Sequence, residues 1–149
     1  MCGRYLDLDG KEIFPWDTVS IDTSSGELDK RWGIINEYRK AKVINARSER
    51  IHYLSLFKDM DPCIIRALGY FEWDKEKKKY LFSNKDKSPI YMAGLYKQEG
   101  FVIITADAYD KYFGIHPRMP FILPKEKLNL WINKKELLRE QAEYDFYQV

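Results

Sequence analysis

Four short fragments of the sequence carry side chains that are more reactive, or more polar, than packing alone requires. Together they supply a thiol, an amide, a carboxylate, an imidazole and several guanidinium groups. These are the groups that nucleophilic and acid–base chemistry uses. The fragments are Cys2-Gly3-Arg4, Asn45-Ala46-Arg47-Ser48-Glu49, Gly69-Tyr70-Phe71-Glu72-Trp73 and Ile115-His116-Pro117-Arg118-Met119-Pro120.

Cys2 directly follows the initiator methionine. Removal of Met1 would leave Cys2 with a free α-amine of pKa about 8 beside a thiol of pKa about 8.5. Both nucleophiles could then attack the same carbon atom. An accidental cysteine at the start of the chain is the alternative interpretation. Cys63 differs, because it begins the apolar run Cys63-Ile64-Ile65 and is predicted to be a buried structural thiol. A disulfide between the two cysteines is disfavoured in a reducing compartment.

Glu72 and His116 are the candidate acid–base pair. In an extended strand, Phe71 and Trp73 point to one side and Glu72 to the other. A carboxyl group among aromatic residues loses hydration, which raises its pKa toward a useful range. His116 and Arg118 lie in a loop with two prolines, which is expected to be rigid. An exposed strand glutamate and an ordinary loop histidine remain the alternatives, and His52 is interpreted as structural.

Composition indicates a soluble globular protein. The chain has 149 residues, a formal charge of +2, 45% hydrophobic residues and 15% aromatic residues. Neither a transmembrane run nor a basic-then-apolar leader is present in the sequence, so we expect a cytoplasmic protein with no membrane partner. Two cysteines and two histidines without paired ligand spacing predict no metal site, and no cofactor is expected.

The elements that must position these residues are mostly short strands. Alternating and apolar runs predict strands at 3–8, 18–21, 31–35, 42–45, 63–73, 80–82, 90–96, 101–105 and 121–123. A short helix is predicted after Ser48, a helical turn at 107–113 and a helix opened by Pro124. The clearest predicted helix begins at Asn133, with Glu136 in capping-box spacing. Many short strands with a few helices predict one α+β domain over residues 1–149.

The fragments, in this order, resemble the SRAP family, the SOS-response-associated peptidases that process abasic sites in DNA. Family members begin Met-Cys-Gly-Arg and carry a Trp-Gly pair, an Asn-Ala-Arg-Ser-Glu motif and an aromatic-Glu-Trp element. Ala-Gly-Leu-Trp and Ile-His-Asp-Arg-Met-Pro elements follow. The corresponding segments here are 1–4, 32–33, 45–49, 69–73, 93–96 and 115–120. The resemblance extends from residue 2 to about residue 123.

The resemblance implies a mixed sheet curled into a pseudo-barrel with a few peripheral helices. It also implies a DNA-damage function and an association with the nucleoid. Cys2, after Met1 removal, would crosslink covalently to abasic sites in single-stranded DNA by forming a thiazolidine. Asn45 would hold the terminus, Glu72 would move protons, and His116 would steady the sugar oxygen of the opened deoxyribose. The implied enzyme is an autopeptidase, a hydrolase that releases Met1, with AP-lyase-like chemistry.

The resemblance assigns DNA contacts as well. Phosphates would be bound by Arg4, Arg47 and Arg118, and bases would stack on Trp32 and Trp73. The partner is therefore single-stranded DNA containing abasic sites, bound by a monomer. Two rival functions remain: a cysteine or N-terminal-nucleophile hydrolase acting in trans, built on Cys2, His116 and Asn45, and a non-covalent single-strand-binding module.

The chain departs from the family pattern at four places. Arg50 replaces the usual threonine, Leu68 a loop acid, and Pro117 an aspartate. The segment Phe14-Pro15-Trp16-Asp17 stands where the family has an asparagine-containing segment ahead of a proline. The sequence therefore predicts an intact reactive set with altered surroundings.

Overall fold

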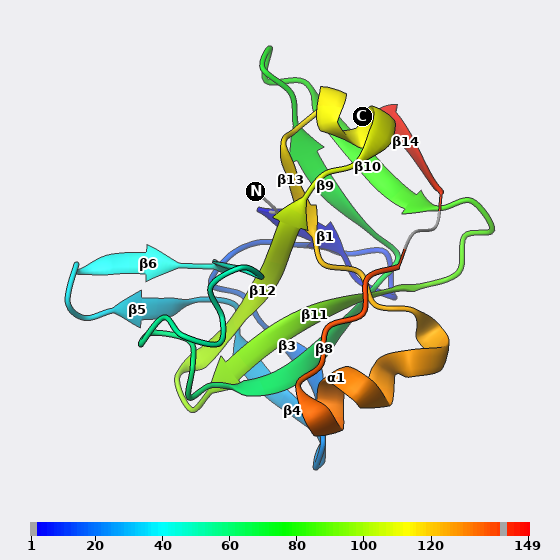
Figure 1. Cartoon of the computed structure of the whole chain (residues 1–149). Helices are drawn as coiled ribbons and strands as arrows, with labels where there is room; N and C mark the ends of the chain where they lie inside the picture. Colours follow the sequence, from blue (N-terminus) through cyan, green and yellow to red (C-terminus); the bar gives the residue numbers. More distant parts are fainter. Residues whose placement is uncertain (1–2, 141–142) are drawn as a thin grey trace.

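One antiparallel sheet carries the first and third of the sequence motifs side by side. It contains β1 (Arg4–Leu6), β2 (Glu12–Ile13), β9 (Gly69–Trp73), β10 (Lys79–Asn84) and β14 (Tyr144–Gln148), in the order β14-β10-β9-β1-β2. The computed structural model describes residues 3–140 and 143–149 (Figure 1). Arg4 pairs with Phe71, so the start of β1 lies next to the end of β9 that carries Glu72.

A second, larger sheet carries the other two motifs. Its order is β13-β12-β11-β8-β3-β4. The bounds are β3 (Thr18–Thr23), β4 (Gly26–Arg31), β8 (Asp61–Ala67), β11 (Ile90–Lys97), β12 (Gly100–Asp107) and β13 (Arg118–Pro120). The short strand β7 (Asn45–Arg47) pairs in parallel with β12. The hairpin of β5 (Ile34–Asn36) and β6 (Ala41–Val43) projects from the body (Figure 1).

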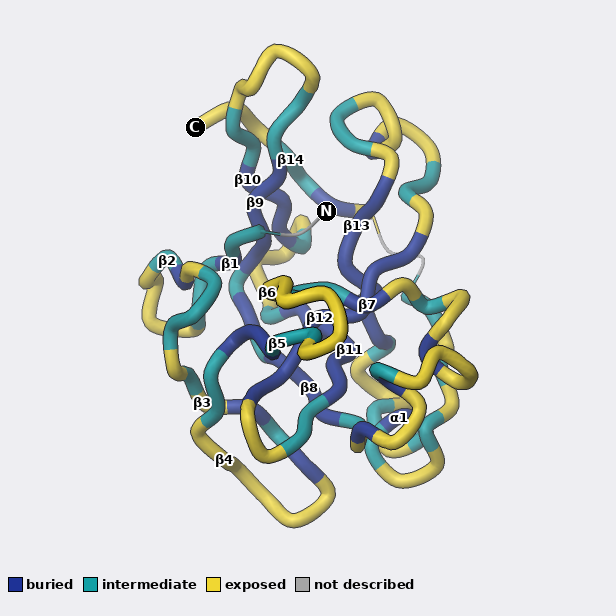
Figure 2. Tube along the Cα trace, turned by 90° about the vertical axis from the view of Figure 1, so that its left-hand side faces the viewer, coloured by how far each residue is buried: buried dark blue, intermediate teal, exposed yellow. Residues whose placement is uncertain are grey.

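One of the two buried hydrophobic clusters lies between the two sheets. Tyr5, Tyr70 and Phe82 from the smaller sheet share one buried cluster with Ile65 and Ile103 from the larger. The trace of β8, β11 and β12 is buried almost throughout, whereas the β5–β6 hairpin and the β3–β4 turn are exposed (Figure 2). The long predicted run 63–73 crosses between the sheets, because it forms β8 in one sheet and β9 in the other.

The main predicted strands are confirmed, but two predicted helices are wrong. Residues after Ser48 form successive turns rather than a helix, although Ile51 and Phe57 are still buried as the pattern required. The predicted helix start at Asn133 is in fact near a helix end, since α1 spans Leu128–Lys134. Lys135 has a left-handed φ of 55° and donates its backbone N–H to Trp131, which stops the helix.

The remaining helical elements are short. They are η1 (Asp110–Gly114), near the predicted helical turn, and η2 (Lys125–Lys127), which follows Pro124. The described residues form one small domain of mostly antiparallel sheets with one short α-helix. This helix, α1, packs against β8, where Trp131 Nε1 donates to the Cys63 carbonyl at 2.8 Å. The pseudo-barrel prediction needs correction, because the sheets among these residues do not close into a barrel.

The prediction of a buried Cys63 is confirmed, since this side chain is 0% exposed and burial raises the pKa of its thiol well above its ordinary value. Within the two described stretches of the chain, no helix is long and apolar enough to span a lipid bilayer.

Candidate functional site

Glu72 and His116 meet at the space between the two sheets. Glu72 points to the inner face of β9 and is only 4% exposed. His116 lies between η1 and β13, and its Nδ1 is 3.9 Å from Glu72 Oε2. Burial raises the pKa of the Glu72 carboxyl from its ordinary value of 4.5 to about 7. The predicted desolvation of this carboxyl is therefore present, and Glu72 is not an exposed strand residue.

The ring orientation of His116 is fixed by its own loop. Nδ1 lies 3.1 Å from the backbone nitrogen of Arg118 and 3.2 Å from its carbonyl oxygen, so the loop holds the ring in place. Burial lowers the pKa of His116, although its contact with the Arg118 backbone acts in the opposite direction. The two shifts have opposite directions: burial makes the Glu72 carboxyl a weaker acid than usual and the His116 imidazolium a stronger one.

Asn45 lies on β7, along the same edge of β12 that β13 occupies further on. Its Nδ2 donates to the Ile103 carbonyl at 3.3 Å, which fixes the amide plane. Its Oδ1 is buried and accepts no hydrogen bond from another described residue. A buried acceptor of this kind is costly unless a donor reaches it. Asn45 therefore has one acceptor oxygen to offer a ligand or a chain terminus.

The predicted stacking of a base on Trp32 needs correction. It is 0% exposed, packs against Tyr5 and Phe101, and donates from Nε1 to the Ile44 carbonyl at 3.0 Å. Its ring has no open face on which a base could stack. The bond to Ile44 instead fixes the backbone immediately before Asn45. Trp32 is thus a positioning residue for the Asn45 motif.

Arg118 also differs from the prediction that it contacts phosphate. The residue is 8% exposed, and its guanidinium bonds to Asp107 at 2.8 Å, Glu49 at 3.1 Å and the Thr105 carbonyl at 3.0 Å. These partners already bond to the guanidinium N–H groups that would otherwise bind a phosphate. The arginine instead ties the His116 loop to β12 and to the Asn45–Glu49 motif.

Three predicted DNA contacts lie on accessible positions. Arg47 is exposed, and its side chain makes no ion pair or hydrogen bond with another described residue. Arg4 is partly exposed and its guanidinium carbon lies 5.1 Å from the centre of the Trp73 ring. Trp73 in turn lines a cleft of about 490 Å³ together with Phe113 and His116. Cys2, the predicted nucleophile, lies outside the described residues.

Sequence reasoning missed several residues of this site. Phe113 and Lys75 line the cleft beside Trp73, but neither belongs to a motif. Glu49 is the partner of Arg118, and its place inside Asn-Ala-Arg-Ser-Glu was the signal that could have identified it. Burial acts to raise the pKa of Glu49, but the hydrogen bonds from Ser48 and Arg118 outweigh this effect, so the pKa is lowered.

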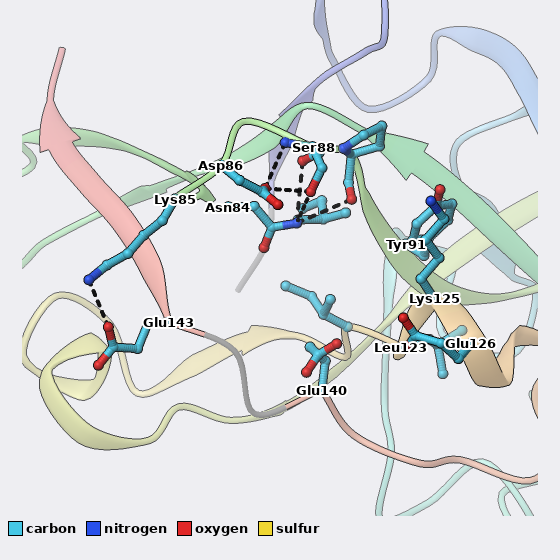
Figure 3. Close-up of a pocket in the computed structure, with 13 residues that line it drawn as sticks. Asn84, Lys85, Asp86, Ser88, Tyr91, Leu123, Lys125, Glu126, Glu140 and Glu143 are labelled. Carbon is cyan, nitrogen blue, oxygen red and sulfur yellow. Dashed lines mark hydrogen bonds and ion pairs between the residues drawn. The ribbon is translucent and has the colours of Figure 1, made fainter.

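A second hollow lies away from these residues, between the β10–β11 loop, the segment after β13 and the approach to β14 (Figure 3). Some of the polar groups that line it bond to each other. Lys85 bonds to Glu143 at 2.7 Å and Ser88 bonds to Asp86 at 2.6 Å. In the parts of the chain that the structure describes, no group of three His, Cys, Asp or Glu side chains is placed to hold a metal ion.

The comparison with protein families agrees with this arrangement. Residues 17–148 match the family model of the SOS response associated peptidases (SRAP), and the chain therefore belongs to this family. It is 32% identical over 118 residues to the abasic site processing protein YedK of Escherichia coli, an alignment that covers 70% of this chain and 53% of YedK.

Another relative is the abasic site processing protein YoqW of Bacillus subtilis, 33% identical over 140 residues, which cover 79% of this chain and 62% of YoqW. The chain thus spans about half to two thirds of the length of these relatives. A crystal structure from Bordetella bronchiseptica has the same fold, with a TM-score of 0.83 at 21% identity over 99% of both chains. One from Bacteroides thetaiotaomicron gives 0.79 at 27% identity, over 93% of this chain and 77% of the other.

Proposed function

We propose that this chain recognises abasic sites in single-stranded DNA and forms a covalent bond with them through Cys2. Family membership and the names of the relatives favour an abasic-site function. The single observation that supports the chemistry best is the buried Glu72 carboxyl, with a pKa of about 7, beside His116. We further propose that residues 1–149 act as one domain.

The reaction conserves atoms and needs no oxidant. After Met1 is hydrolysed off, the Cys2 α-amine adds to the C1′ aldehyde of the ring-opened abasic deoxyribose. Loss of water gives an imine. The Cys2 thiol then adds to the imine carbon, and its proton passes to the nitrogen to close a five-membered thiazolidine. Each stage moves a proton to or from the same small region. A single group that both accepts and donates protons near neutral pH therefore suits the whole sequence.

Glu72 has this property. As the acid it donates a proton to the departing hydroxyl, and as the carboxylate it accepts the thiol proton. The neutral His116 acts as a hydrogen-bond donor to the O4′ hydroxyl that ring opening releases. Asn45 Oδ1 accepts from the Cys2 amine and holds it against the aldehyde. Arg4 and Arg47 bind flanking phosphates, and Trp73 stacks on a neighbouring base.

The first prediction tests the covalent bond. Purified protein mixed with a single-stranded oligonucleotide that carries one abasic site is expected to give a heat-stable shifted band on a denaturing gel. Cys2→Ala should abolish the band, because both the thiol and the amine–thiol geometry are lost. The intact mass of the active protein should lack Met1. Cys63→Ala is the matched control, since Cys63 is buried, and it should still give the band.

Other outcomes assign a different function. Turnover of peptide or amide substrates in trans, without any covalent band, would replace the proposal with a cysteine hydrolase. Binding of the oligonucleotide that survives Cys2→Ala, again without a covalent band, would leave a non-covalent single-strand-binding module. Retention of Met1 in a crosslinking sample would overturn the thiazolidine mechanism, because an acylated amine cannot form the imine.

A further inference from the structure

Tyr112 lies in η1, shortly before His116 in the chain, and its side chain is buried against the smaller sheet. The residue is 3% exposed, and η1 lies beside β14 (Figure 1). The centre of its ring is 6.1 Å from that of Phe82 on β10 and 5.8 Å from that of Phe146 on β14. Because η1 connects β12 to β13 of the larger sheet, this ring reaches from the His116 loop of one sheet into the other sheet.

The hydroxyl group of Tyr112 bonds to the backbone of β14. The Tyr144 N–H donates to Tyr112 Oη at 2.7 Å, and Tyr112 Oη donates to the Tyr144 carbonyl at 3.4 Å. A hydroxyl can accept and donate at the same time, and the N–H and C=O of one strand residue point to the same side. Tyr144 begins β14, at the end of the strand order, and is fully buried. The hydroxyl therefore supplies partners that buried backbone groups require.

The backbone of Tyr112 holds the other end of this connection. Its carbonyl accepts from the Ile115 N–H at 3.1 Å and from the His116 N–H at 3.3 Å. The loop is closed by a bond of 2.9 Å from the Ala108 N–H to the Pro117 carbonyl. One residue thus contacts the His116 backbone through its carbonyl and the smaller sheet through its hydroxyl.

This connection matters because Glu72 and His116 come from different sheets. Glu72 lies on β9, and β10 lies between β9 and β14 in the same sheet, where Asn84 pairs with Tyr144. His116 reaches the carboxyl only from its loop, with 3.9 Å between Nδ1 and Oε2. A bond between that loop and β14 therefore limits how far His116 can move from Glu72.

We propose that Tyr112 is a positioning residue, which holds His116 beside Glu72 by fastening the His116 loop to the backbone of β14. The inference rests on the proposed function for the reaction that these two groups serve. Arg118 cannot replace this connection, because its bond to the Thr105 carbonyl ties the loop to β12 of the larger sheet. Small displacements of reacting groups reduce rates strongly, so loss of the Tyr112 hydroxyl has a kinetic effect.

Tyr112→Phe is the test variant, because it keeps the buried ring and removes only the hydroxyl. The first measurement is amide hydrogen exchange of the protein without DNA. Protection of the Ile115 and His116 amides is expected to fall about tenfold, because the loop opens more often once its bonds to β14 are lost. Amides of β8 should keep their protection. An equal loss in β8 and the loop, or no loss in the loop, would overturn the role of Tyr112.

The second measurement is the single-turnover rate of crosslinking to an abasic single-stranded oligonucleotide. Tyr112→Phe should lower this rate about tenfold. The affinity for an undamaged fluorescent oligonucleotide, measured by anisotropy, should stay unchanged. In a His116→Ala background, Tyr112→Phe should have little further effect, since no imidazole remains to be positioned. The full effect of Tyr112→Phe in that background would contradict the proposal.

Two control variants separate positioning from a general loss of stability. Tyr147→Phe removes a hydroxyl from the same strand, but from a side chain that is 49% exposed. Ile64→Val shortens a buried side chain on β8 and should lower protection of the β8 amides rather than of the loop. Neither control should change the crosslinking rate of the folded protein. A rate loss in either control as large as that in Tyr112→Phe would overturn the proposal.

The two measurements also distinguish this inference from the proposed chemistry. A loss of protection confined to the loop in Tyr112→Phe, without any covalent band from the wild type, would refute the chemistry and retain the connection to β14. A covalent band from the wild type, with the same rate and the same loop protection in Tyr112→Phe, would refute the role of Tyr112 alone.

Discussion

The pKa values of two glutamates in the smaller sheet shift in opposite directions, because the two side chains face opposite sides of the sheet. Glu72 on β9 points inward, and its burial raises the pKa to about 7. Glu12 on β2 points outward and bonds to Arg4 at 3.0 Å and to Lys79 at 2.8 Å. Burial acts to raise the pKa of Glu12, but the hydrogen bonds and charges of these two cations outweigh this effect, and the pKa is lowered.

This difference in pKa gives the two faces of one small sheet different chemical properties. The inner face keeps a proton on a carboxyl at a pH where water would have removed it, which acid–base chemistry requires. The outer face keeps its carboxylate ionised and uses it to align two cations. We therefore expect proton transfer on the face where water is excluded and DNA contacts where cations and rings remain accessible.

The largest expected effect belongs to the inner face. Glu72→Gln should slow crosslink formation by about 100-fold or more, because the amide keeps the shape but can neither give nor take a proton. Affinity for undamaged single-stranded DNA should be nearly unchanged. The wild-type rate should depend on pH around 7, and that dependence should disappear in the variant. Single-turnover gel assays across pH, together with anisotropy, provide both measurements.

A parallel loss of affinity and rate in Glu72→Gln would make this residue structural and remove the contrast between the two faces. The matched control is Glu12→Gln, which changes the same residue type on the other side of the sheet. It should leave the pH dependence of the chemical step as it is in the wild type.

The second effect concerns folding stability. A carboxyl whose folded-state pKa is raised binds protons more tightly when folded, so its stabilising contribution is complete below pH 4.5 and is lost as pH rises through about 7. Glu72→Gln should therefore gain stability relative to wild type across this window, by about 3 kcal/mol in total. Urea unfolding at several pH values measures the difference. His116 is present in both proteins, so its own titration largely cancels. A pH-independent difference would contradict the raised pKa.

Local pattern was enough to predict most strands and the desolvation of Glu72. The alternation of aromatic residues around Glu72 and the apolar run from Cys63 are properties of a few neighbouring residues. The helix predicted after Asn133 failed because its limits depend on a distant contact. Lys135 Nζ bonds to the Lys58 and Met60 carbonyls, and its left-handed backbone ends α1 where the sequence suggested a beginning.

For two of the predicted site residues, the residue type suggested a DNA contact that the tertiary structure does not allow. Arg118 and Trp32 are residue types that often contact nucleic acids, but here both side chains are buried against other parts of the protein. Asp107, Glu49 and Thr105 surround the guanidinium, and the core surrounds the indole. Phe14 was recognised only as a departure from the family pattern. Its contact with Arg4 depends on the pairing of β1 with β2, which a linear sequence does not display.

The smallest expected effect tests the outer face. Glu12→Gln removes the anion between Arg4 and Lys79, so both cations become available to phosphate. We expect affinity for undamaged single-stranded DNA to rise a few-fold at low salt, with a slope of log affinity against log salt that is steeper by less than about one. Anisotropy measures both quantities. A few-fold loss of affinity would mean that alignment of the cations by Glu12 matters more than the charge it neutralises. Arg4 and Lys79 would then form a pair of cations that Glu12 holds in position, and a phosphate would bind beside Glu12 rather than replace it.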